Sequence, residues 1–188
     1  MFAVSSDKTE ILSLQVVYAP RVGTGAVPRL VEKTTGPVHL LAANDQVVAW
    51  AVEGAPGLTV RAVKGGSKRR VFSAPEDIAA LALSPQGREP YYADQGHLYA
   101  GTKALPIKVK TGPVLLATDA GFLYWTESAE DGDEVSLCRC SLDALQDDKV
   151  EKVRIAGSVS ALAAEQGSVY AVQSKGDKFQ LLRYAFKP

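Results

Sequence analysis

The sequence predicts an all-β protein built from short antiparallel strands, and three observations support this fold class. The apolar runs are short and rich in Val, Leu, Ile, Tyr and Ala, and Gly, Pro, Asn and Asp separate them. Helical periodicity is nearly absent, and 16 glycines and 10 prolines interrupt the chain. Similar strand patterns also recur at near-regular spacing, which is typical of repeat architectures.

Length and composition fit one globular domain. The chain has 188 residues, which is enough for a real hydrophobic core. Hydrophobic residues make up 46% and charged residues 22%, so disorder is not expected. The 21 basic residues balance the 21 acidic ones, and a nucleic-acid binder usually shows a basic excess. Nucleic acid is therefore disfavoured as a partner.

One repeat is nearly identical in its two copies. Residues 35–41 read TGPVHLL and residues 111–116 read TGPVLL, and their first residues lie 76 positions apart. The similarity extends backwards, to AVPRLVEK before the first copy and ALPIKVK before the second. Two units of about 38 residues would account for this offset. Further copies are then expected near SAPEDIAALAL, 73–83, and AGSVSALAAEQG, 156–167.

Each predicted unit contains four strands in the same order. The first strand is apolar on both faces and therefore buried, as in VHLLAAND, IAALALSPQG, VLLATDAG and VSALAAEQG. The second strand carries aromatic residues, as in QVVAWAVEG, REPYYADQG, GFLYWTES and GSVYAVQSK. The third strands are LTVRAVKGG, GHLYAGT, EVSLCRCSL and KFQLLRYAF, and the fourth strands are KRRVFSAP, PIKVK and KVEKVRIAG. The last unit has no fourth strand in this reading.

Four short antiparallel strands per unit predict the blades of a β-propeller. A single domain over residues 1–188 would contain units of approximately 1–36, 37–76, 77–112, 113–157 and 158–188. The best helical candidate is SLDALQDD, 141–148, which allows about two turns after a possible N-cap at Ser141.

The number of blades is left open between three arrangements. If AVPRLVEK, 26–33, completes the last unit, the chain makes four blades. If ILSLQVVYAP, 11–20, belongs to most of a further blade, the count is about five. The chain could also be a partial propeller that oligomerisation completes, because an open sheet edge invites pairing with another copy.

The segment LYWTE, 123–127, resembles the Tyr-Trp-Thr-Asp repeat of YWTD-type β-propellers. The longer string LLATDAGFLYWTES is similar to bacterial propeller repeats, and residues 91–94 resemble a degenerate copy. The resemblance covers about residues 30–188 and implies a propeller fold, although six-bladed members need more chain than this. It also implies that the closing acids, Asp94 and Glu127, form hydrogen bonds between blades. Trp50 and Gln173 break the pattern near their own copies.

The aromatic residues of the second strands are expected to pack between blades. They are Trp50, Tyr92, Tyr124, Trp125 and Tyr170. Large rings bury much area per residue and would fix the angle between neighbouring sheets.

Four residues are candidates for ligand binding. Tyr91 and Tyr92 could stack on a sugar ring, as could Tyr124. His39 lies on a predicted inner strand, where it could line a channel and act as a base, or serve as a core or rim histidine.

Two charged runs favour solvated turns over binding sites. Glu127, Glu130, Asp131, Asp133 and Glu134 could bind calcium, but their spacing does not match the EF-hand loop, and Gly132 marks a hairpin. The basic run VKGGSKRR, 63–70, also occupies a predicted hairpin.

No metal or cofactor is expected. Cys138 and Cys140 lie two apart, too far for an unstrained disulfide on a strand, and are read as reduced thiols. The two histidines of the chain stand alone, so zinc is disfavoured.

The sequence favours a non-enzymatic propeller that binds another protein or assembles with itself. No Gly-x-Ser-x-Gly, His-Glu-x-x-His or P-loop motif occurs. The alternatives are a carbohydrate-binding propeller and a lyase- or lactonase-type enzyme. No signal peptide or transmembrane segment is evident, so a cytoplasmic location is the default expectation, with a missing native start as the alternative.

Overall fold

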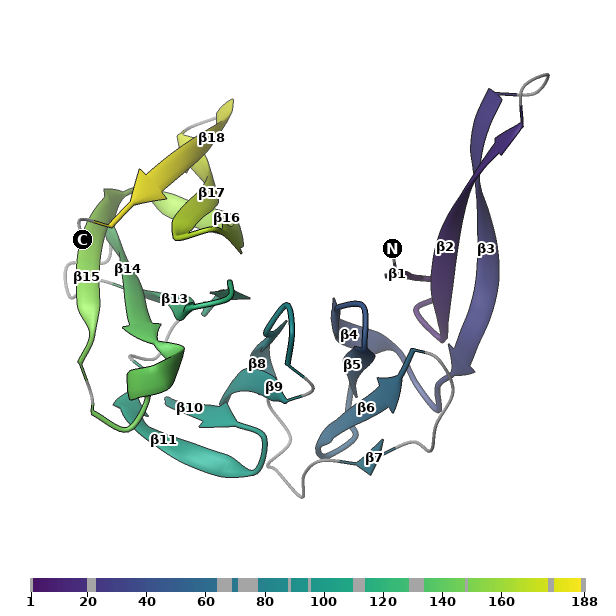
Figure 1. Cartoon of the computed structure of the whole chain (residues 1–188), viewed down its shortest axis with the longest axis horizontal. Coiled ribbons are helices and arrows are strands. Elements are labelled where there is room, and N and C mark those ends of the chain that lie inside the picture. The colour runs from purple at the N-terminus through teal and green to yellow at the C-terminus, as the bar shows by residue number, and fades with distance from the viewer. Residues whose placement is uncertain are drawn as a thin grey trace. The chain divides into compact units, whose positions relative to one another are not determined.

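The protein is described by a computed structural model covering residues 2–19, 23–63, 69–70, 78–87, 89–94, 96–109, 114–128, 134–147, 149–175 and 178–186. The chain divides into two compact units, residues 1–76 and 77–188. Among the described residues, all sheets are antiparallel and the one helix is a short 3-10 turn (Figure 1). The predicted all-β fold class is therefore confirmed.

The sheets are simple meanders in which each strand pairs with the next one along the chain. The described residues form three four-stranded sheets, β4–β7, β8–β11 and β12–β15, and two three-stranded sheets, β1–β3 and β16–β18 (Figure 1). These are the blades of a β-propeller, as the repeats predict. That all five sheets form one domain stays a prediction.

The first unit contains the sheets β1–β3 and β4–β7. Residues 11–19 and 26–33, which the sequence places in alternative blade arrangements, pair with each other within the strands β2 and β3. Both segments therefore belong to one three-stranded sheet. The strands of this unit are β1 Phe2–Val4, β2 Glu10–Ala19, β3 Gly23–Lys33, β4 Val38–Ala43, β5 Val47–Val52, β6 Leu58–Ala62 and β7 Arg69–Arg70.

The two sheets of the first unit share an apolar core. Ile11 of β2 packs with Val38 of β4 and with Val48 and Trp50 of β5. All four side chains are buried. Trp50 thus lies where two sheets meet.

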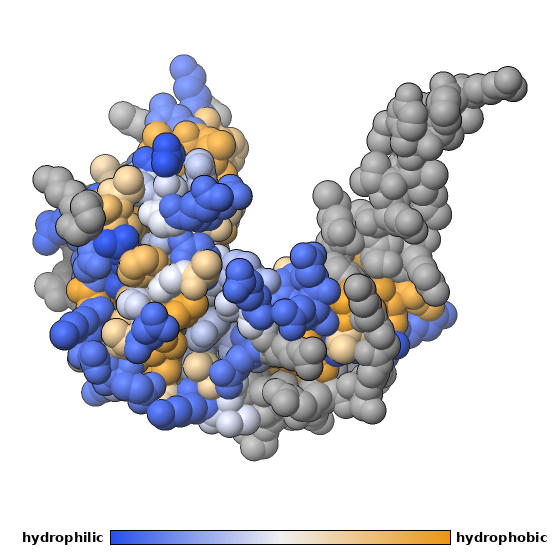
Figure 2. Space-filling model, in the orientation of Figure 1, coloured by the Kyte–Doolittle hydropathy of each residue, from blue (hydrophilic) through white to orange (hydrophobic). Residues whose placement is uncertain are grey.

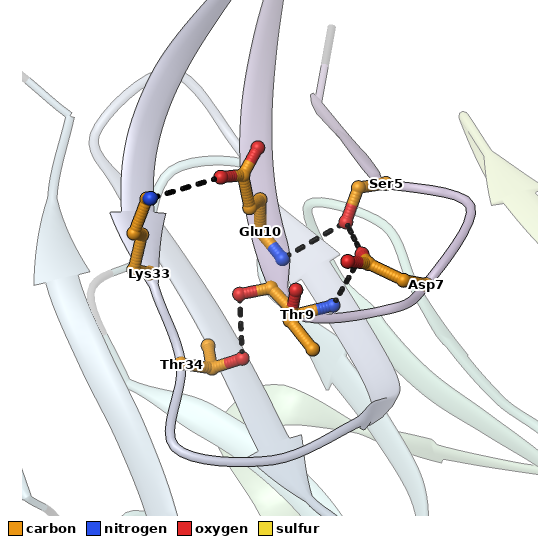
Figure 3. Close-up of polar contacts among 6 residues, drawn as sticks. All are labelled: Ser5, Asp7, Thr9, Glu10, Lys33 and Thr34. Carbon is orange, nitrogen blue, oxygen red and sulfur yellow. Dashed lines mark hydrogen bonds and ion pairs between the residues drawn. The ribbon is translucent and has the colours of Figure 1, made fainter.

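The turn between β1 and β2 is held by a compact set of polar contacts (Figure 3). Asp7 Oδ1 accepts hydrogen bonds from Ser5 Oγ at 2.6 Å and from the Thr9 N–H at 3.1 Å. Thr34, which follows β3, donates from Oγ1 to the Thr9 carbonyl at 2.9 Å. An ion pair of 3.5 Å joins Lys33 to Glu10. The turn and the connection into β4 are therefore fastened together.

The second unit contains the sheets β8–β11, β12–β15 and β16–β18. Its strands are β8 Ile78–Leu83, β9 Pro90–Asp94, β10 His97–Ala100, β11 Lys103–Lys108, β12 Leu116–Thr118, β13 Phe122–Ser128, β14 Glu134–Ser141, β15 Glu151–Ala156, β16 Ser158–Glu165, β17 Ser168–Lys175 and β18 Lys178–Ala185.

The central sheet of this unit, β12–β15, is packed on both faces. Leu123 and Trp125 point to one face and join a core with residues of β8–β11, including Tyr91. Tyr124 and Leu137 point to the other face and join a core with residues of β16–β18. The period of two in a strand produces this division between adjacent residues.

The helical candidate at residues 141–148 is shorter than expected. Only Leu142–Ala144 are helical, in a single 3-10 turn. Ser141 caps this turn as predicted, because its side chain accepts a hydrogen bond from the Asp143 N–H. One turn suffices because β14 and β15 are neighbours in the same sheet.

Within the described part of the chain, no helix is both long and apolar enough to span a bilayer.

Candidate functional site

Glu127, the acid that closes the LYWTE segment, is bonded inside its own sheet. Trp125 Nε1 donates to Glu127 Oε1 at 2.9 Å, and Lys152 Nζ of β15 lies 2.8 Å from Glu127 Oε2. Glu127 is only 3% exposed, so the pair neutralises a charge that would be costly to bury alone. A blade-to-blade role for Glu127 stays a prediction.

A different acid, Asp119, accepts a hydrogen bond from a neighbouring sheet. It lies in the turn between β12 and β13, where its Oδ1 accepts from the N–H groups of Gly121 and Phe122 at 2.9 and 2.8 Å. Its Oδ2 accepts from Tyr124 Oη at 2.9 Å and from the Gly167 N–H at 2.7 Å. Gly167 belongs to the turn between β16 and β17, so this carboxylate links two consecutive sheets.

Thr118, the residue before Asp119, links β12 to the β8–β11 sheet. Thr118 Oγ1 donates to the Leu83 carbonyl at 2.6 Å, and Leu83 is the last residue of β8. Consecutive residues at the end of β12 therefore bond to both neighbouring sheets.

The four hydrogen bonds set the charge state of Asp119. Burial raises its pKa, since the residue is only 4% exposed. The hydrogen bonds from Gly121, Gly167, Tyr124 and Phe122 together lower the pKa by more than burial raises it. The net result is a pKa below the usual range. The same environment raises the pKa of Tyr124, through burial and the adjacent carboxylate. Both groups keep their ordinary charge at neutral pH, which suits a structural link.

A buried arginine forms the second polar centre of the unit. Arg139 of β14 makes two hydrogen bonds to Glu151 of β15, at 3.0 and 2.9 Å. Its guanidinium carbon lies 4.5 Å from the ring centre of Phe122 and 4.4 Å from that of Phe186. Phe186 follows β18, so this cation–π contact also joins neighbouring sheets.

The predicted ligand-binding tyrosines of β9 are both buried and point to opposite faces of their sheet. Tyr91 lies in the core shared with Trp125. Tyr92 stacks on Tyr99, with ring centres 4.6 Å apart. Burial raises the pKa of both phenols. The rings are largely occupied by protein contacts, and a ligand-binding role for them stays a prediction.

The other predicted site residues lie on separate strands. His39 is exposed on β4 of the first unit, and Trp50 is buried on β5. In the second unit, Asp94 is buried at the end of β9 and Tyr170 is half-buried on β17. The roles assigned to them stay predictions.

The charged runs lie mostly outside the described residues. Of the acidic run, residues 129–133 are not described, and of the basic run, residues 64–68 are not. The described residues hold no group of three or more His, Cys, Asp or Glu placed to bind a metal. Cys138 and Cys140 are both buried free thiols.

Hydrophobic side chains lie on the surface of β18. Phe179 is 72% and Leu181 is 70% exposed, and they share one face because they are two residues apart. Figure 2 shows hydrophobic surface in the region of β16–β18. By strand pairing, Tyr170, Val172 and Arg183 lie on the same face. We call these five residues the open face.

Sequence reasoning missed Asp119, Arg139 and Phe186. A signal for Asp119 was present, because Asn44 occupies the matching turn of the first unit. Asn44 Oδ1 accepts from the N–H groups of Gln46 and Val47, the same pattern that Asp119 makes with Gly121 and Phe122. No sequence pattern marks the contacts of Arg139, which depend on how the sheets stack.

No family model and no curated protein sequence matches the chain significantly. Solved propeller structures do match. A TolB-like protein from Agrobacterium tumefaciens aligns with a TM-score of 0.60 and 15% identity, over 85% of this chain and 62% of the other. The tricorn protease aligns with a TM-score of 0.58 and 14% identity, over 94% of this chain and 24% of the other. This chain thus spans less than two thirds of either protein. At these identities the similarity establishes the β-propeller fold.

Proposed function

We propose that the chain is a non-enzymatic β-propeller module that binds another protein, or a second copy of itself, through the open face. The single observation that carries this proposal is the exposure of Phe179 and Leu181. Adjacent exposed apolar side chains of this size are typical of an interaction surface. The resemblance of LYWTE to YWTD-type repeats supports the proposal only at the level of the fold.

The equivalent face of the β12–β15 sheet is covered by a neighbouring sheet, which allows a direct comparison with the open face. Register places Arg139 opposite Tyr124 in β12–β15, and Arg183 opposite Tyr170 in β16–β18. Leu137 and Leu181 each lie two residues before these arginines. Leu137 is fully buried because β16–β18 packs over it, whereas Leu181 is 70% exposed. The open face is therefore equivalent to a face that receives another sheet.

The test uses a library of displayed ten-residue peptides, together with light scattering of the protein over a range of concentrations. The wild type is expected to enrich a peptide family or to self-associate. The double variant Phe179→Glu/Leu181→Glu should do neither. Ala104→Glu, at an exposed position of β11, is the matched control and should behave as the wild type.

The proposal fails if neither peptides nor a second copy bind to the folded wild type. It also fails if binding survives the double variant unchanged.

A further inference from the structure

The second unit contains two sheets with a fourth strand, β8–β11 and β12–β15, and a third sheet, β16–β18, in which the described residues form three strands. In β12–β15, the fourth strand β15 pairs with β14 over six residues. In β16–β18, the strand order ends at β18 within the described residues. The segment FLYWTES of β13 aligns with SVYAVQS of β17, so β18 corresponds to β14.

The pairing of β15 on β14 has a defined chemical pattern. Glu151 lies opposite Arg139, and its carboxylate takes both guanidinium hydrogen bonds. Val153 lies opposite Leu137, and two residues later Ile155 lies opposite Val135. The fourth strand therefore reads acid, any residue, apolar, any residue, apolar.

β18 presents matching positions for the same pattern. Arg183 occupies the position in β18 that Arg139 occupies in β14. In this structure it donates to the Ser168 hydroxyl from Nε and Nη2, at 3.1 and 2.8 Å. Leu181 and Phe179 stand where Leu137 and Val135 do. The strand, KFQLLRYA, carries two basic residues and no acid, which favours an acid at the position opposite Arg183.

The outer edges of the two four-stranded sheets of this unit differ from β18. β11 contains Pro106, which lacks an N–H, and β15 carries three exposed charged residues. Both are devices that discourage strand addition. β18 has a Lys at its first residue and an Arg near its last, with exposed apolar residues between them.

We propose that β18 accepts an extended strand of a partner protein, antiparallel to it, with Asp or Glu opposite Arg183 and apolar residues opposite Leu181 and Phe179. Main-chain hydrogen bonds supply the affinity in this mode, and the side chains set the register. The inference rests on the proposed function and assigns it a partner chemistry.

The probe is a fluorescein-labelled peptide with the sequence of residues 149–157, KVEKVRIAG, measured by anisotropy against the wild-type protein. Saturable binding is expected. Arg183→Glu should weaken it by about tenfold or more, because a charge-assisted pair becomes a repulsion. Arg183→Lys should retain most of it. Lys103→Glu, on the edge strand β11, is the matched control and should have no effect.

A charge swap separates recognition from damage to the fold. A second peptide with Lys in place of the glutamate should bind Arg183→Glu better than it binds the wild type. Equal binding of the two peptides by both proteins would overturn the proposal, and so would a lack of binding to the wild type.

A cross-link reports the register and excludes exchange of the peptide into the β12–β15 sheet. The peptide carrying Cys in place of Ile155 is supplied as its thionitrobenzoate disulfide, and the thiolate of the variant Phe179→Cys should attack it, form a mixed disulfide with the peptide and release thionitrobenzoate. It should do so faster than with a peptide carrying Cys in place of Lys152, which would point to the other face. The opposite order would overturn the proposed pairing. If these peptides fail while binding to displayed peptides or a second copy still depends on Phe179 and Leu181, the proposed function stands and this inference falls.

Discussion

The backbone N–H of Gly167 donates a hydrogen bond of 2.7 Å to Oδ2 of Asp119, and the two residues belong to consecutive sheets. Gly167 has a φ of 76°, a conformation that suits glycine, so the turn presents its N–H at low backbone cost. The bond ends in a buried carboxylate that three other donors hold in place. We therefore expect the stability of the second unit to depend on this side chain.

Asp119→Ala removes the acceptor of four hydrogen bonds and should destabilise the protein by about 2–4 kcal/mol, because buried donors lose their partner. Asp119→Asn keeps one acceptor oxygen and should cost less. Denaturant unfolding of both variants measures the difference. Asp147→Asn, at an exposed position, is the control and should change little. A wild-type midpoint for Asp119→Ala would contradict the role given to this residue.

The lowered pKa of Asp119 predicts an acid-sensitive contribution to stability. The stabilisation is fully present above the unfolded-state pKa of 3.8 and is lost as pH falls through the lower folded-state pKa. The free energy of unfolding of the wild type should therefore fall between pH 5 and about pH 2 more steeply than that of Asp119→Asn. Parallel pH profiles for the two proteins would exclude this carboxyl as a source of the acid sensitivity.

Trp125→Ala should destabilise the protein by roughly 3–5 kcal/mol, since the side chain is fully buried between two sheets. Tyr124→Phe keeps the ring but loses the hydroxyl bond to Asp119, and should cost only about 1 kcal/mol. Thermal and denaturant melts test both. A Trp125→Ala protein that melts like the wild type but loses a ligand would favour a binding role instead.

Arg139→Lys should cost about 1.5–3 kcal/mol although the charge is kept. Lysine cannot make both bonds to Glu151 or stack flat between the rings of Phe122 and Phe186. Arg154→Lys provides the control, because Arg154 is 79% exposed and its ion pair with Glu134 should contribute under about 1 kcal/mol. Equal effects from the two substitutions would mean that burial of Arg139 contributes nothing.

Both thiols should resist modification in the folded protein. Burial and, after it, the nearby Glu127 carboxylate raise the pKa of Cys138 to about 12, so almost no thiolate forms at pH 8. Cys140 is buried beside it. A disulfide reagent such as dithionitrobenzoate should react with neither thiol until denaturant is added, and then with both. Rapid reaction of the native protein would show that β14 opens readily.

The strand pattern made the fold predictable because each blade repeats the same local chemistry. The TGPV repeat and the aromatic pairs located the strands, and the structure then placed Tyr124 and Trp125 on opposite faces of β13. The contacts between sheets were less accessible. Glu127 matched the closing position of the YWTD-type repeat, but that resemblance says nothing of Asp119, whose bond from the Gly167 N–H in the next sheet depends on how the two turns lie.

The open face was missed for a related reason. KFQLLRYAF was recognised as a third strand, but its exposure depends on whether another strand or sheet covers it, and that depends on partners outside the strand itself. The pairing of 11–19 with 26–33 was also hidden, since each segment resembled a strand of a different unit. Local sequence thus identified the strands better than it identified their neighbours.

The alternation of Tyr124 and Trp125 limits how these repeats can change in evolution. Each contributes to a different interface, although a single peptide bond separates them. Deleting or inserting one residue in β13 would exchange the two sets of side chains and disrupt both interfaces at once. Substitutions that preserve size are tolerated far better there. Changes in length are therefore expected to accumulate in the turns, where the units of this chain already differ.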